Sequence, residues 1–487
     1  MTSQSQWQIR PYRRKFTFSL SLISALILSG CASPNNEKLP DTKPIQHYQY
    51  QAAMADMEAM DWPNQRWWVS LNDQQLTELI EQGLKDSPSV AAAKARLQQA
   101  QGVAIQAGAS QSLHVNAEAS VYQAKASYNY TSYVPESAYY WNDYATLGLN
   151  FSYDLDFWGK NRKQVEAAVS QAAAQEAELA SSQLQLSTSI AKAYTELTRL
   201  YHNLDTAKEA LQIRQKTTEL LNKRFNNGLE TKGSVSQAQS RQASAKADLL
   251  AVEEAIDLQK NVLAALVGAG PDKALMIKRP SVELEQSIGL PDNLGVGLIG
   301  HRPDISAARW QVEAAAKQVG VAKDNFYPNV TINAFLGYQA FGLDNLFSSD
   351  TAAGNVGPAI YLPIFNGGQL EGQLTAAQAQ YKLAVSNYDQ SVTNAFKELA
   401  DVVSSHQRLE QRLASIRQAL DSAQHAYTVA SNRYQGGLAT YLDVLSAENA
   451  VLSNQRALAN LQSRSLALHI QLVHALGGGF QIKQSDK

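Results

Sequence analysis

The sequence predicts a mainly α-helical chain that also carries short β-strands in pairs. Three observations support this fold class. Apolar residues recur at spacings of three and four over long segments, four short segments alternate apolar and polar residues, and the same order of features occurs in both halves of the chain.

The internal duplication is carried by matching motifs. The segment from Arg224 to Thr231 (RFNNGLET) returns from Arg433 to Thr440 (RYQGGLAT), and Pro88 opens a segment that is similar to the one beginning at Pro303. Because the motifs keep their order, each half is predicted to contain a helix, a strand, a loop, a strand, a very long helix, a tight turn and a returning helix.

The long helix of the second half is predicted from a heptad seam that alternates spacings of three and four without a break. Its positions are Leu374, Ala377, Tyr381, Ala384, Tyr388, Ser391, Ala395, Leu399, Val402, His406, Leu409, Leu413, Ile416, Leu420, Ala423, Tyr427, Ala430 and Tyr434. At about 1.5 Å per residue, such a helix spans roughly 90 Å. A shorter seam runs from Leu186 to Leu211 in the first half. An ordinary antiparallel coiled coil would show the same seam, so this alternative stays open.

Strands are predicted around Val115–Val121, Leu147–Tyr153, Val330–Leu336 and Val356–Leu362, where apolar and polar residues alternate. One apolar and one polar face suit a membrane β-barrel, although a soluble sandwich gives the same pattern. Four strands cannot close around a usable channel, so strands that cross a membrane would have to be shared among several copies. This argument does not fix the number of copies.

The N-terminus predicts a lipoprotein signal peptide over residues 1–30. Basic residues from Arg10 to Lys15 precede an uncharged run, Phe16–Leu28, that ends in a sequence resembling a lipobox, Leu28-Ser29-Gly30-Cys31. The Cys31 thiol is expected to carry an N-acylated diacylglycerol lipid, including palmitate, and no other cofactor is expected. Since no aspartate follows Cys31, the lipid anchor is expected in the outer membrane.

Composition and motifs argue against several other classes of protein. The formal net charge of −2 does not suggest nucleic-acid binding. The eight histidines are scattered, and no nucleophile elbow, phosphate loop or metal-ligand spacing is present. Asp154 and Asp156 precede a predicted helix start, where carboxylates favour the helix N-terminus. We therefore expect no catalytic residue, no metal site and no enzyme activity.

Four motifs resemble the TolC-like outer-membrane efflux factors, in the NodT/OprM lipoprotein branch. They are Trp67–Ile80, Asp154–Gly159, Leu298–Ala308 and Gly320–Pro328. The resemblance covers essentially the whole chain after the signal peptide. It departs at His301, where the family often has arginine.

The resemblance implies a homotrimer in the outer membrane, with a twelve-stranded β-barrel, a long α-helical barrel that extends into the periplasm, and a mixed α/β equatorial domain. It also implies a passive duct of a tripartite efflux system. Its partners would be a periplasmic membrane-fusion adaptor, an inner-membrane efflux pump and outer-membrane lipid. The cargo would be small toxic compounds, as in multidrug resistance, and the chain would do no chemistry on it.

With this resemblance, the chain is expected to divide into successive segments. These are 1–30, the signal peptide; 31–85, the lipid-anchored segment and part of the equatorial domain; 86–270, the first repeat; 271–300, the equatorial connector; 301–479, the second repeat; and 480–487, the C-terminal tail.

The resemblance also implies a gate at the periplasmic turns. Residues from Thr440 to Ala447 align with the family's pore constriction, where Asp443 would form an acidic ring in the trimer that favours cations. We expect Tyr434 and Tyr441 to help hold this gate shut. An ordinary solvated acid on a helix face remains the alternative for Asp443. The expected adaptor contacts are Arg224, Gly228, Leu229, Thr231, Arg433, Gly437, Leu438 and Thr440.

Two other functions stay open at this stage: an outer-membrane channel for protein secretion, and a structural lipoprotein that crosses the periplasm without a pore. The sequence names neither the exported compounds nor the type of pump.

Overall fold

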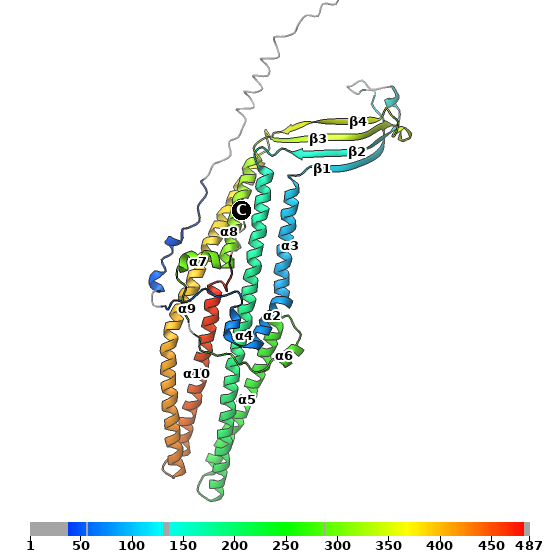
Figure 1. Ribbon diagram of the computed structural model, residues 1–487. Coiled ribbons are helices and arrows are strands. Elements are labelled where there is room, and N and C mark those ends of the chain that lie inside the picture. Colours follow the sequence, from blue (N-terminus) through cyan, green and yellow to red (C-terminus); the bar gives the residue numbers. More distant parts are fainter. Residues whose placement is uncertain (1–37, 55–56, 128, 130–135, 287, 482–487) are drawn as a thin grey trace, which may run out of the picture. The chain divides into compact units, whose positions relative to one another are not determined.

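A computed structural model describes residues 38–54, 57–127, 129, 136–286 and 288–481. The predicted signal peptide and lipidation site, including Cys31, lie outside these residues. The chain divides into two compact units (Figure 1). Of the described residues, the first unit contains 38–41, 101–127, 129, 136–171 and 312–385, and the second contains 42–54, 57–100, 172–286, 288–311 and 386–481.

The element order confirms the predicted duplication. The first half contains α3 (Pro88–Ala109), β1 (His114–Ala124), β2 (Asn142–Asp154), α4 (Lys160–Asn226) and α5 (Lys232–Leu266). The second half repeats this order with α8 (Pro303–Asp324), β3 (Asn329–Phe341), β4 (Ala352–Tyr361), α9 (Gln369–Gln435) and α10 (Tyr441–Ala475). Corresponding helices have equal lengths: 22 residues for α3 and α8, 67 for α4 and α9, and 35 for α5 and α10.

Shorter helices precede the first repeat, connect the two repeats and occur in the loops between strands. They are η1 (Ile45–His47), η2 (Gln51–Ala53), η3 (Trp67–Leu71), α2 (Gln74–Asp86), α6 (Asp272–Met276) and α7 (Leu294–His301), together with η4 (Glu136–Tyr139) and η5 (Leu343–Asn345) in the strand loops. In the described residues of the region predicted to form a mixed equatorial domain, the β component is one isolated parallel bridge between Ala59 and Leu290. None of the described helices is long and apolar enough to cross a bilayer.

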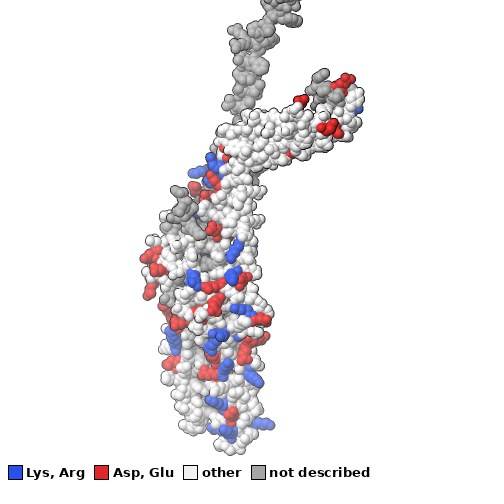
Figure 2. Space-filling model, turned by 45° about the vertical axis from the view of Figure 1, so that its right-hand side comes forward, with Lys and Arg blue, Asp and Glu red and all other residues white. Residues whose placement is uncertain are grey.

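In the first unit, the four strands form an antiparallel sheet in the order β1-β2-β3-β4. Val115 pairs with Phe151 across the first ladder, and Leu149 pairs with Leu336 across the second. Large apolar side chains on these strands stay exposed, among them Val121, Leu336 and Val356. The sheet face seen in Figure 2 accordingly shows a band that is almost free of charged residues. The described residues provide no second sheet to cover it, which does not fit the soluble-sandwich alternative.

Of the two carboxylates predicted near the start of α4, Asp156 caps the helix. The two oxygens of Asp156 accept hydrogen bonds of 2.9 Å from the backbone N–H groups of Asn161 and Arg162. Asp154 accepts a 2.6 Å hydrogen bond from the Thr331 hydroxyl of β3. Both carboxylates are thus engaged in local structure, as expected near a helix N-terminus.

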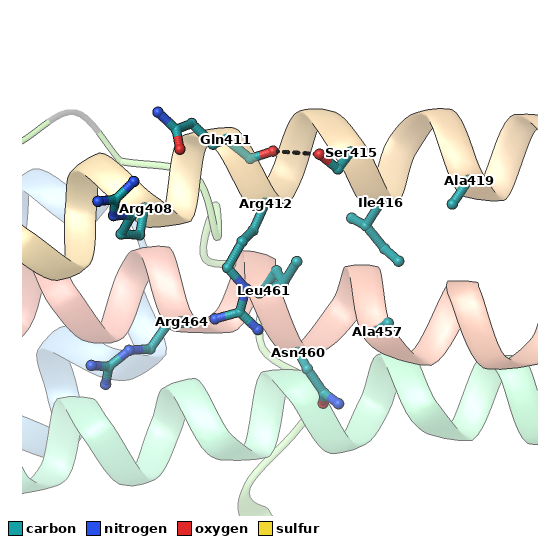
Figure 3. Close-up of a pocket in the computed structure, with 10 residues that line it drawn as sticks. All are labelled: Arg408, Gln411, Arg412, Ser415, Ile416, Ala419, Ala457, Asn460, Leu461 and Arg464. Atoms are coloured by element: carbon teal, nitrogen blue, oxygen red, sulfur yellow. Dashed lines mark hydrogen bonds between the residues drawn. The ribbon is translucent and has the colours of Figure 1, made fainter.

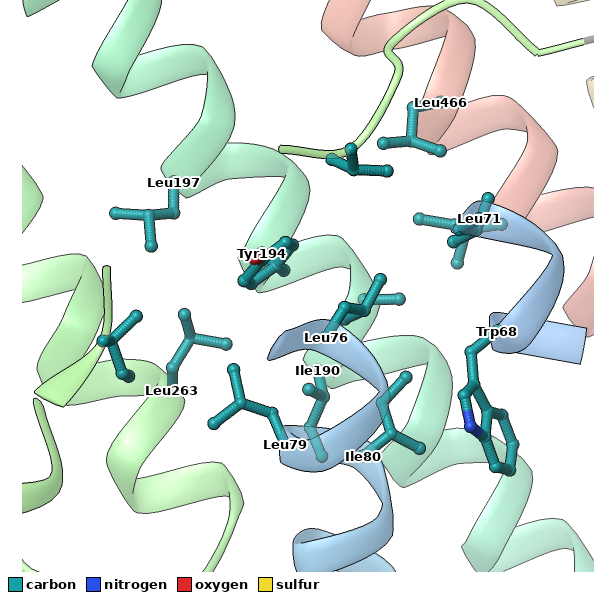
Figure 4. Packing of buried hydrophobic residues seen from close by; sticks show 14 of the residues in the cluster. Trp68, Leu71, Leu76, Leu79, Ile80, Ile190, Tyr194, Leu197, Leu263 and Leu466 are labelled. Atoms are coloured by element: carbon teal, nitrogen blue, oxygen red, sulfur yellow. The ribbon is translucent and has the colours of Figure 1, made fainter. Parts of the chain in front are cut away.

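The pairs α4–α5 and α9–α10 form two long helical hairpins, whose helices belong to the second unit except for the first residues of α4 and α9 (Figure 1). The seam prediction is confirmed, because every predicted seam position of α9 and α4 is buried or half-buried. The main core of this unit joins the long helices to η3 and α2 through residues such as Trp68, Leu76, Tyr194, Leu263 and Leu466 (Figure 4).

Arg302 belongs to one of the motifs that resemble the efflux factors, and it contacts α8, α9 and α10. Its buried guanidinium makes ion pairs of 2.7 Å with Asp304 and 2.8 Å with Glu398 of α9. It also donates a 2.9 Å hydrogen bond to the carbonyl of Ala475, at the end of α10. A planar guanidinium with several fixed donors can satisfy all three partners at once, which explains arginine at this position.

Candidate gate at the helix turns

The two turns between the long helices have the same backbone geometry. In each, a glycine adopts a positive φ, +72° at Gly228 and +73° at Gly437. The next residue donates back to the carbonyl of the arginine five positions earlier, Leu229 to Arg224 at 2.9 Å and Leu438 to Arg433 at 2.8 Å. This is the Schellman ending of a helix, and it explains the spacing of arginine, glycine and leucine in the duplicated motif.

The leucine side chains of these turns are not packed against the preceding helix. In a Schellman ending, the residue after the glycine commonly packs on the last helical turn. Here the side chains of Leu229 and Leu438 are 66% and 73% exposed. Each hairpin therefore ends in an apolar side chain that one copy of the chain leaves open to a partner.

The returning helices begin at threonine caps. Thr231 accepts a 3.2 Å hydrogen bond from the Ser234 N–H at the start of α5. Thr440 opens α10 in a reciprocal capping box, in which its own N–H and hydroxyl each donate to the Asp443 carboxylate at 2.8 Å. These hydrogen bonds hold the pKa of Asp443 below its usual value.

Asp443 therefore has a local structural role, which is distinct from the role predicted for it at the gate. Its side chain is exposed at the turn, yet its carboxylate caps the helix that it belongs to. The sequence contained this signal, because a threonine followed three residues later by an acid is a helix-start pattern. The acidic ring itself requires further copies of the chain, and it stays a prediction.

Tyr434 connects the two hairpins. Although it lies near the end of α9, it is buried and contacts residues of the other hairpin. Its hydroxyl donates to Glu230 at 3.3 Å, and the Arg224 guanidinium lies 4.9 Å from the centre of its ring. Burial, followed by the charge of Glu230, raises the pKa of the Tyr434 hydroxyl, which therefore stays neutral and able to donate.

Tyr441 lies 6.2 Å from Tyr434, measured between ring centres, in the same apolar cluster. The cluster joins all four long helices with Leu221 of α4, Val235 of α5 and Leu445 of α10. The structure thus brings the two predicted gate tyrosines together. Arg433, by contrast, donates within its own turn, to the Leu438 carbonyl at 3.3 Å.

A buried ion pair beneath the turns was missed by the sequence analysis. Glu448 of α10, 2% exposed, accepts from Arg214 of α4 at 3.2 Å. Burial raises the pKa of Glu448, although the nearby charges of Arg214 and Arg241 oppose the shift. A sequence signal existed, because Glu448 falls in the apolar series Tyr441, Leu445, Glu448, Leu452 of α10.

At the turns, the described side chains cap helices and make contacts between the hairpins. The described residues contain no group of three histidine, cysteine, aspartate or glutamate side chains that could hold a metal ion. The polar groups at the turns instead cap helices or join one hairpin to the other. Such contacts suit a conformational gate between two packed states.

Comparison with known proteins places these features in a family. Residues 79–269 and 296–478 match the family described as outer membrane efflux protein. The multidrug resistance outer membrane protein MdtP of Shigella flexneri is 32% identical over 472 residues, covering 94% of this chain and 95% of the relative. The fusaric acid resistance protein FusA of Burkholderia cepacia is 34% identical over 384 residues, covering 75% of this chain and 70% of the relative.

A solved structure agrees with this assignment. The outer membrane protein VceC of Vibrio cholerae is 56% identical and superposes with a TM-score of 0.81, covering 86% of this chain and all of that one. The resemblance to outer-membrane efflux factors inferred from the motifs is confirmed. The chain belongs to the outer membrane efflux protein family and is an outer-membrane efflux channel.

Proposed function

We propose that three copies of the chain form a passive duct that carries small toxic compounds out of the cell. The duct would receive them from a periplasmic adaptor and an inner-membrane pump, which supplies the energy. The relatives named for multidrug resistance and fusaric acid resistance support this class of cargo. In this proposal the chain does no chemistry on the cargo.

The observation that carries the proposal is the sheet with two open edges. Within the described residues, β1 and β4 each pair on one side only. An unpaired edge is costly in lipid, because its backbone N–H and C=O groups find no water there. If β1 of each copy pairs with β4 of the next, three copies close the sheet and leave no edge. The exposed apolar side chains of the strands would then face lipid.

The turns at the ends of the hairpins are the proposed gate. Tyr434, with Arg224 and Glu230, would hold one hairpin against the other in the closed state. Leu229 and Leu438, with their capping threonines and glycines, would be the surface that the adaptor contacts. Adaptor binding would then open the gate by replacing contacts between the hairpins.

The Asp443 side chains of the three copies would form the acidic ring at this gate. Because Asp443 also caps α10, the test has to separate loss of the charge from loss of the cap. Asp443→Asn removes the charge and keeps an oxygen that can accept from Thr440, whereas Asp443→Ala also removes the cap. In planar bilayers, we expect Asn to shift the reversal potential in a salt gradient toward less cation preference. An unchanged reversal potential in the Asn variant would remove Asp443 from the pore.

The lipid anchor completes the proposal. Lipidation of Cys31 would hold the N-terminus in the outer membrane. Mass spectrometry of the purified chain should show the added lipid and no residues before Cys31. An N-terminal peptide that retains residues 1–30 without lipid would contradict this part of the proposal.

A deletion strain tests the efflux role directly. Loss of the chain should increase susceptibility to several toxic compounds, and the wild-type chain should restore resistance. If secreted proteins are lost instead and susceptibility is unchanged, the chain is a secretion channel.

A further inference from the structure

Three arginines line an open groove between α9 and α10. The groove has a volume of about 1120 Å³ and includes Arg408 and Arg412 of α9 and Arg464 of α10 (Figure 3). Figure 3 shows Arg412 extending from α9 toward Leu461 of α10. Within the described part of the chain, these three guanidinium groups have no hydrogen bond or ion pair. They contrast with Arg199 of α4, which is paired with Glu196.

The floor of the groove is apolar. This floor consists of Ile416 and Ala419 of α9 and Ala457 and Leu461 of α10, next to the arginines along the groove, and the polar residues Gln411, Ser415 and Asn460 also line the groove (Figure 3). Alanine at two of these positions leaves room that larger side chains would fill. The groove thus combines an apolar floor with three cationic groups at its rim, the combination that recognises an organic anion with an apolar body.

The groove lies on the face of the hairpin opposite to the connector. Arg417 of α9 and Gln462 of α10 both donate to Glu285 of the connector, at 2.5 and 3.1 Å. Since successive residues of a helix are about 100° apart, Arg412 and Arg464 point away from that side. Placing the connector, which the family resemblance assigns to the equatorial domain, on the outside of the proposed duct puts the groove on the side of the lumen. This orientation rests on the proposed function.

We propose that the groove is a binding site for small organic anions, carboxylates or sulfonates with an apolar body, on the inner wall of the duct. The guanidinium groups hold the anionic group and the apolar floor holds the body. In the trimer, three such grooves would concentrate anionic cargo inside the duct before it leaves.

The site is tested by direct binding to the purified full-length chain in detergent. The probe is pyranine, a pyrene dye that carries three sulfonate groups, and its fluorescence anisotropy reports binding without any channel activity. We expect Arg408→Gln, Arg412→Gln and Arg464→Gln together to weaken binding roughly tenfold or more, because three charge-assisted contacts are lost. The triple substitution to lysine should keep most of the affinity and excludes a folding defect as the cause.

Arg417→Gln is the control for a nonspecific charge effect, because it removes one positive charge from the opposite face of α9 by the same type of substitution. It should leave pyranine binding unchanged. Equal affinity in wild type and the triple glutamine variant would overturn the proposal while leaving the efflux function intact. Loss of the trimer in the triple glutamine variant, seen by cross-linking, would also overturn it and assign the groove to contact between copies.

Discussion

Asp73 stabilises the middle of the helical unit through hydrogen bonds to three segments. Its carboxylate is 2% exposed and accepts from the N–H of Leu76, the hydroxyl of Tyr194, and both the N–H and the hydroxyl of Ser281, at 2.9 to 3.0 Å. Burial acts to raise the pKa of Asp73, but these four donors hold it below its usual value.

Asp73→Asn should destabilise the chain by about 2 kcal/mol at neutral pH, because several donors lose a charged acceptor. The sign of the pH effect follows from the lowered pKa. The contribution of Asp73 is present above its unfolded pKa of about 3.9, and it is lost as the pH falls through the folded value. Thermal unfolding followed by circular dichroism should show a lower midpoint for the variant at neutral pH, with a smaller difference in acid.

Asp61→Asn is the control for this prediction, because Asp61 is an exposed acid in the same region. It should leave the midpoint unchanged. If Asp73→Asn is also indistinguishable from wild type at neutral pH, the carboxylate does not stabilise the unit in the way described.

Among the elements, the hairpin turns are joined by contacts that can be removed one at a time. Tyr434→Phe removes the hydroxyl that donates to Glu230 and keeps the ring beside Arg224. Tyr434→Ala removes both contacts and leaves a cavity in the apolar cluster. We expect the alanine variant to raise the open fraction of the gate roughly tenfold or more, and the phenylalanine variant to have a smaller effect.

This prediction is measured in cells as uptake of a hydrophilic antibiotic too large for ordinary porins. Tyr388 of α9, which is buried in the same helix far from the turns, provides a control as Tyr388→Phe. Equal uptake in the wild type and in Tyr434→Ala would show that Tyr434 does not hold the gate.

The long helices could be predicted from the sequence because heptad spacing is a local property. Each seam position needs only its neighbours three and four residues away, and all the predicted positions are buried or half-buried. The strands were predicted for the same reason, although β4 ends at Tyr361 rather than Leu362, just before Pro363, which lacks a backbone donor.

Contacts between hairpins could not be predicted in this way. The link from Tyr434 to Arg224 and Glu230 joins residues that are far apart in the chain, and no periodicity indicates which residues meet. The same holds for Arg214 with Glu448, and for Ser281 with Asp73. The capping role of Asp443, by contrast, follows from local spacing, because Asp443 stands three residues after Thr440 at the start of a helix.

For the whole molecule, the open edges of the sheet and the matching ends of the hairpins point to the same assembly. In the part of the chain that the structure describes, a single copy exposes apolar strand residues, unpaired strand edges and apolar turns. Exposing each of these features to water costs free energy. The cost is removed if copies join around an axis, with lipid around the strands and an adaptor at the turns. The equal lengths of corresponding helices in the two halves allow both hairpins to end in similar turns.

Ion conductance of the purified full-length chain in planar bilayers tests the proposed gated duct most directly. The wild type should show discrete conductance steps that are small because the turns are closed, and Tyr434→Ala should show larger or longer openings. Absence of conductance in both proteins, despite correctly assembled trimers, would contradict the duct and favour a structural lipoprotein without a pore.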